Sequence, residues 1–160
     1  MTSINSLDLK KFIINAVRDV FDTMLSMEVE TVEEPSLENF NGGRIVGSIG
    51  FAGLVMGNLN LHVDEVFARQ MTAAMLDLET DDIEGNEEIN DVIGELCNMI
   101  CGGLKSRLCD EGLACELSIP SITSGKEFTI ESQGWARSER YGFRNHQHTA
   151  LVEIFMKSAN

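Results

Sequence analysis

The sequence predicts an α+β fold in which an antiparallel sheet packs against two long helices that belong to an imperfect internal repeat. Apolar residues recur at steps of three and four over residues 7–27 and again over residues 87–109, which predicts two amphipathic helices. Short apolar runs bounded by Gly, Pro, Ser and Asn fill much of the remaining chain and predict strands. Because a helix followed by strands occurs twice, we expect the two halves to be related.

The remaining elements follow from local patterns. They are expected in this order: a loop over 28–41, a β-hairpin of strands 44–50 and 54–63 with its turn at 50–53, a short helix over 65–76, an acid-rich loop over 77–88, and, after the long helix, strands over 115–119, 127–131, 135–142 and 149–157. Asp64 precedes the short helix and is expected to cap it.

Length and charge restrict the domain organisation and the function. A chain of 160 residues is expected to form a single domain over residues 1–160. The sequence contains 12 Lys and Arg residues and 26 Asp and Glu residues, which gives a net charge of −14. This charge disfavours binding to nucleic acid or anionic membranes. The sequence has neither an apolar run long enough to span a membrane nor the features of a secretory signal, so we expect a cytoplasmic protein.

The four cysteines are expected to be free thiols that pack as small apolar side chains in a reducing compartment. They are Cys97, Cys101, Cys109 and Cys115. Cys97 and Cys101 are one helical turn apart, but no second Cys or His pair at zinc spacing lies nearby.

Neither of two other segments fits a metal site. The acid-rich segment 77–88 lacks the alternating ligands and the terminal Glu of a calcium-binding EF-hand loop. His146 and His148 fall on one side of a possible strand without a third ligand at a recognisable spacing. We therefore expect no metal ion or cofactor bound by this chain itself.

One face of the long helix carries the candidate site. Asp91, Glu95, Asn98 and Gly102 are separated by three or four residues and lie opposite the apolar stripe. Asn98 and Gly102 are poor helix formers, and Gly costs up to ~1 kcal/mol relative to Ala in a helix interior. Glu95 and Asn98 could reach the same bound molecule, and Gly102 would let that molecule approach the helix closely. On spacing alone, an ordinary polar helix face remains the alternative.

The pattern Asp91-x-x-x-Glu95-x-x-Asn98, with Gly102-Gly103 and the distal Pro120, resembles the signature of the CheX/CheC/FliY family of phosphatases that act on the response regulator CheY. Gly50-Phe51-Ala52-Gly53-Leu54-Val55-Met56-Gly57 is similar to the glycine-punctuated hairpin of that family, and Pro120-Ser121-Ile122-Thr123-Ser124-Gly125 is similar to its segment after the helix. The resemblance implies a CheC-like fold.

A single site makes the chain most similar to the CheX branch. CheC-like members carry two such helical motifs, whereas here residues 19–22, which would align with the motif, offer no Asn at its second position. The resemblance to CheX also implies a homodimer with one site in each subunit.

The resemblance implies a phosphatase that removes the aspartyl phosphate from a CheY-like response regulator. Asn98 would position the attacking water, since an uncharged amide can both accept from and donate to it. Glu95 would engage the active-site lysine of the regulator, with Asp91, Gly102 and Pro120 in supporting roles. Mg²⁺ is expected on the partner. The alternative is a non-catalytic binding module that docks on a receiver or another signalling protein.

Overall fold

The structure, a computed structural model, describes residues 3–37, 40, 43–126, 128, 130 and 133–159. Its described strands form one seven-stranded sheet in the order β1-β6-β7-β3-β2-β4, with β5 also paired to β2, and every pairing is antiparallel. The strands are β1 (Glu30–Val32), β2 (Arg44–Gly53), β3 (Val55–Asp64), β4 (Cys115–Leu117), β5 (Ser121–Gly125), β6 (Arg137–Asn145) and β7 (His148–Ser158).

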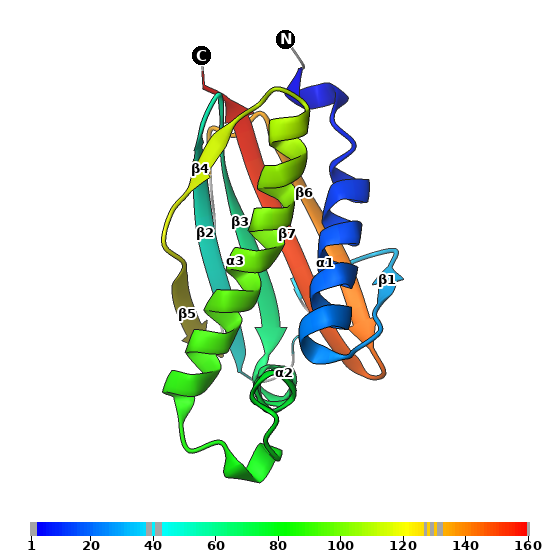
Figure 1. The fold of residues 1–160 in the computed structure, drawn as a ribbon, viewed down its shortest axis with the longest axis vertical. Coiled ribbons are helices and arrows are strands. Elements are labelled where there is room, and N and C mark those ends of the chain that lie inside the picture. The colour runs from blue at the N-terminus through cyan, green and yellow to red at the C-terminus, as the bar shows by residue number, and fades with distance from the viewer. Residues whose placement is uncertain are drawn as a thin grey trace.

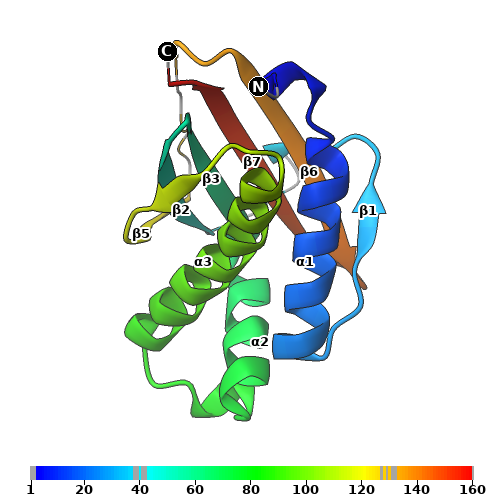
Figure 2. The same cartoon turned by 45° about the horizontal axis from the view of Figure 1, so that its top comes forward.

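Three α-helices cover one face of this sheet (Figure 1). They are α1 (Leu9–Leu25), α2 (Glu65–Leu76) and α3 (Asn86–Asp110). The two long helices α1 and α3 lie side by side, and α2 packs near their lower ends (Figure 2). The predicted α+β class, with an antiparallel sheet against long helices, is confirmed.

The sheet order also contains the expected internal repeat. The hairpins β2–β3 and β6–β7 meet in the middle of the sheet through β3 and β7. The short strand β1, which follows α1, pairs with β6, whereas β4 and β5, which follow α3, pair with β2. Each half is therefore a helix, an edge segment and a hairpin, and each edge segment pairs with the hairpin of the other half.

Helix boundaries agree closely with the sequence because they are set by local caps. The Asp64 carboxylate accepts a hydrogen bond from the Phe67 backbone N–H at 2.6 Å and starts α2, as predicted. The Asp8 carboxylate accepts similarly from the Lys11 N–H and starts α1. Ser26 ends α1 in the left-handed conformation, at a φ of 53°.

The strand predictions needed three corrections. The pairing of β2 with β3 ends at Phe51 opposite Gly57, so the hairpin connection lies at residues 52–56 and not at 50–53, and β2 continues to Gly53 through its pairing with β4. The predicted strand 127–131 lies partly outside the described residues, which omit 127, 129 and 131. The edge strands β1 and β5 were not predicted, because they are short, largely polar and partly exposed.

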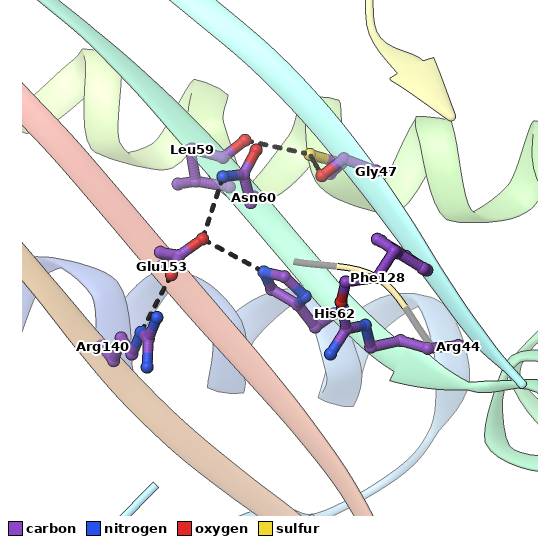
Figure 3. Close-up of polar contacts among 9 residues, drawn as sticks. Arg44, Gly47, Leu59, Asn60, His62, Phe128, Arg140 and Glu153 are labelled. Carbon is purple, nitrogen blue, oxygen red and sulfur yellow. Dashed lines mark hydrogen bonds and ion pairs between the residues drawn. The ribbon is translucent and has the colours of Figure 1, made fainter. Parts of the chain in front are cut away.

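On the opposite face of the sheet, a buried polar network ties three strands together (Figure 3). The Glu153 carboxylate on β7 accepts hydrogen bonds from Asn60 Nδ2 at 3.1 Å and His62 Nε2 at 3.2 Å on β3, and from Arg140 Nε at 2.9 Å on β6. Burial alone would raise the pKa of Glu153. The hydrogen bonds from His62 and Asn60, together with nearby positive charge, have the larger combined effect, so the pKa of Glu153 is lowered.

None of the described helices combines the length and the apolar character that crossing a bilayer requires.

Candidate functional site

The four polar and small residues of the predicted row lie on the same side of α3. The helix is continuous from Asn86 to Asp110, so its geometry brings Asp91, Glu95, Asn98 and Gly102 onto one stripe. Asp91 and Glu95 are exposed, and Asn98 and Gly102 are partly buried. Within the described part of the chain, no hydrogen bond or ion pair engages the Asp91, Glu95 or Asn98 side chain.

The opposite side of α3 anchors this stripe. Ile93, Leu96, Cys97 and Ile100 are fully buried in the core between the helix and the sheet. Their burial fixes the rotation of α3, and it thereby fixes the direction in which the candidate residues point.

The two adjacent glycines have different structural roles. A Cβ atom at Gly103 would lie 3.0 Å from Ala16 Cβ, so this glycine permits the close packing of α3 against α1. A Cβ atom at Gly102 would have no neighbouring atom within 4 Å. The space above Gly102 is therefore open within the described chain.

The edge segment that follows α3, residues 115–125 with strands β4 and β5, runs beside α3 and contains Pro120. Near the end of α3, Lys105 Nζ forms an ion pair with the Glu116 carboxylate at 3.1 Å. Further toward its start, a Cβ atom at Gly94 would lie 3.7 Å from Pro120 Cγ. Asn98 lies between these two contacts along α3, so the segment between β4 and β5 borders the site.

Sequence analysis missed three residues of this border. Gly94 lies directly before Glu95, and a Cβ atom there would be in ordinary van der Waals contact with Pro120. As a glycine inside a predicted helix, it carried the same signal as Gly102. Lys105 on α3 and Ile119 gave no comparable signal, because each borders the site only where the segment of residues 115–125 lies beside α3.

The surface shape at the stripe differs from that of a small-molecule site. One hollow of the described chain lies between α1 and the turn of β6 and β7, and another lies between α1 and α3. Neither is lined by Glu95 or Asn98. The two residues project from an open helix surface, which suits contact with a macromolecule.

The cysteines are free, and three of the four are buried as predicted. Cys109 is exposed, so the prediction of burial was wrong there, because it lies on the outer side of the last turns of α3. Cys97 Sγ contacts the Gly47 carbonyl at 3.3 Å, and burial raises the pKa of the Cys97 thiol to about 12. This thiol is therefore protonated and unreactive at neutral pH.

In the described part of the chain, no group of three or more His, Cys, Asp or Glu residues is placed to hold a metal ion. The ring of His148 stacks on Phe67 with centroids 5.3 Å apart, as part of the packing between β7 and α2.

The candidate stripe on α3 carries the Asn98 amide beside the carboxylates of Asp91 and Glu95. Such a set can order a water molecule and engage a cation.

Comparisons with known proteins place these features in a family context. Residues 45–144 match the family described as "Chemotaxis phosphatase CheX". A chemotaxis protein CheX from Vibrio vulnificus is 26% identical, with a TM-score of 0.81, over 94% of this chain and 97% of that one. A CheC-like superfamily protein from Shewanella sp. PV-4 is 28% identical, with a TM-score of 0.81, over 96% of this chain and 99% of that one.

A third similar structure is a complex of CheX with CheY, BeF3 and Mg²⁺ from Borrelia burgdorferi. It is 19% identical, with a TM-score of 0.77, over 94% of this chain and 99% of that one, and at this identity it supports the fold alone. A comparison with curated proteins gave no match.

Proposed function

Because the chain belongs to the CheX chemotaxis phosphatase family, whose activity is the dephosphorylation of CheY, we propose that Glu95 and Asn98 on α3 are its working pair. The observation that carries this proposal is the Asn98 amide, which is held on a rigid helix, is partly buried, and makes no hydrogen bond within the described chain. We further propose that residues 1–160 act as one CheX-like domain in the cytoplasm, where the free cysteines would stay reduced.

Asn98 acts on the attacking water. An aspartyl phosphate is a mixed anhydride, and water attacks its phosphorus in line with the leaving carboxylate. The Asn98 carbonyl accepts a hydrogen bond from that water, and its NH₂ group donates to a neighbouring oxygen. Because the amide is uncharged, it does not repel the phosphoryl oxygens, and its contribution is orientation.

Glu95 acts on the partner protein. A carboxylate pointing at a phosphoryl group would be repelled, so its favourable contact is a cation beside that group. The active-site lysine of the regulator supplies such a cation. The ion pair fixes how deeply α3 enters and where Asn98 meets the water.

The supporting residues shape this approach. Gly102 leaves open space in which the partner can come close to the helix. Pro120 packs beside Gly94 and holds the edge segment against α3, next to Glu95. Asp91 is exposed one turn before Glu95 and adds negative charge toward the same cation.

The residues of the stripe do not fit a magnesium site of their own. Two exposed carboxylates, Asp91 and Glu95, beside one amide are a poor ligand set for Mg²⁺, which prefers a near-octahedral set of oxygen ligands that includes substrate phosphates. We therefore assign the Mg²⁺ to the phosphorylated partner. The complex of a CheX with CheY from Borrelia burgdorferi holds BeF3 and Mg²⁺, which is the composition that this assignment expects of a complex with the regulator.

Replacing Glu95 with Ala is expected to raise KM for the phosphorylated regulator by about tenfold and to lower kcat less than a change at Asn98 does, because a cross-interface ion pair is lost. Steady-state phosphate release measures both constants. Asp19→Ala is the matched control, since it removes an exposed acid from α1. If Glu95→Ala binds the regulator as tightly as the parent protein, the proposed role of Glu95 is wrong.

We also propose that the chain forms a homodimer. Among the described residues, the three-residue strand β1 stands at one end of the sheet and pairs with β6 alone, so its other edge is available to a partner strand. Sedimentation equilibrium at micromolar concentration should give twice the 17.7 kDa of one chain. A mass equal to one chain would contradict this proposal.

A further inference from the structure

The edge segment beside the candidate site contains a β-bulge. β4 ends with Leu117 opposite Phe51, and β5 begins with Ser121 opposite Ser48. The three residues 118–120 therefore stand opposite only two residues of β2. A bulge of this kind interrupts the ladder at a sheet edge and turns a side chain away from its usual direction.

The bulge presents Ile119 to solvent from a fixed position. Ile119 is 89% exposed, the largest exposed fraction among the large apolar side chains of the described chain. Before it, the Ser118 N–H donates to the Gly50 carbonyl at 2.8 Å, and the Gly50 N–H donates to Ser118 Oγ at 2.9 Å. After it, Pro120 lies over Gly94 of α3, where a Cβ atom would be 3.7 Å from Pro120 Cγ. A single exposed apolar residue is common, but this one is held on both sides.

The bulge lies next to Asn98. Two neighbouring pairs show how the segments lie side by side: Lys105 with Glu116, and Gly94 with Pro120. Residues 94–105 of α3 therefore run beside residues 116–120 of the edge segment. Asn98 lies within the first range, and the bulge at residues 118–120 lies within the second. A protein that covers Asn98 therefore also covers the bulge.

We propose that Ile119 is a positioning residue that inserts into an apolar patch beside the phosphorylation site of the receiver domain. This inference rests on the proposed function and adds to it. The acidic stripe contributes an ion pair, whereas Ile119 contributes apolar area that is removed from water on docking. Two contacts of different chemistry, one on each side of Asn98, hold the receiver against α3. Ile119 itself touches no reacting atom.

The test compares Ile119→Ser with Val66→Ser, which removes a 60% exposed apolar side chain from α2. Ile119→Ser is expected to raise KM by about tenfold with kcat unchanged, since the lost burial weakens the complex. Its affinity for the receiver activated with beryllofluoride and Mg²⁺ should fall by the same factor. Ile119→Leu should restore both values, and Val66→Ser should change neither.

Each result separates this inference from the proposed function. Equal receiver affinity for Ile119→Ser and Val66→Ser would overturn the inference, even if Asn98→Ala abolished turnover. A fall in affinity with Ile119→Ser supports it, even if hydrolysis depended on a residue other than Asn98. Circular dichroism of each variant should match that of the parent protein, because both side chains are exposed.

Discussion

Asn98→Ala is expected to lower kcat for dephosphorylation of the receiver by roughly 10²-fold or more, the scale on which loss of a positioning group is felt. KM should change little, because the amide contacts the reacting water and contributes little area to docking. The fold should persist, since Asn98 is on the outer side of α3 and makes no hydrogen bond within the described chain.

Asn15→Ala is the matched control for this prediction. Asn15 is an exposed asparagine on α1, so the same chemical group is removed from the other long helix. Single-turnover measurements at saturating protein separate the chemical step from docking. Full activity in Asn98→Ala, or an equal loss in Asn15→Ala, would remove Asn98 from the mechanism.

Glu153→Ala is expected to lower the free energy of unfolding by about 2–6 kcal/mol, because it leaves two buried donors without an acceptor at about 1–3 kcal/mol each. Glu153 is 1% exposed and accepts hydrogen bonds from Asn60, His62 and Arg140. Its loss leaves the donors of Asn60 and His62 buried without an acceptor. Urea unfolding at one fixed protein concentration measures the change.

This stabilisation should depend on pH. The pKa of Glu153 in the folded protein lies below its ordinary value of 4.5, so the carboxylate contributes fully above that value. The contribution is lost as the pH falls through the folded-state pKa. The difference in stability between parent and Glu153→Ala should therefore be constant near neutral pH and shrink in acid.

Glu30→Ala is the control for the stability measurements. Glu30 forms an exposed ion pair with Arg144 at 3.3 Å, and such pairs contribute little. If Glu153→Ala were no more destabilising than Glu30→Ala, the buried network would not stabilise the sheet.

The elements that were predicted well are those whose signals are local. The periodicity of α3 and the Asp64 cap of α2 lie within a few residues of the boundaries they set. The edge strands β1 and β5 were missed, because a short strand at the edge of a sheet is defined by its pairing with a distant segment. The sequence of β5 alone resembles a polar loop.

The same distinction applies to the site. The stripe from Asp91 to Gly102 follows from helix geometry, so the sequence alone could predict it. The position of Ile119 depends on a one-residue shift in the register between β2 and the edge segment, which no local pattern encodes. His62 gave no signal either, since its burial requires that Glu153, 91 residues further on, lies beside it.

The central claim is that this chain hydrolyses the aspartyl phosphate of a CheY-type receiver through Asn98. Its most direct test is the decay of phosphorylated receiver, in the presence of Mg²⁺, with a substoichiometric amount of the protein. We predict that the parent protein accelerates the decay with many turnovers per molecule, while Asn98→Ala binds the receiver and leaves the decay close to its spontaneous rate. A parent protein that binds the phosphorylated receiver and leaves its decay unchanged would contradict the account and identify a binding module.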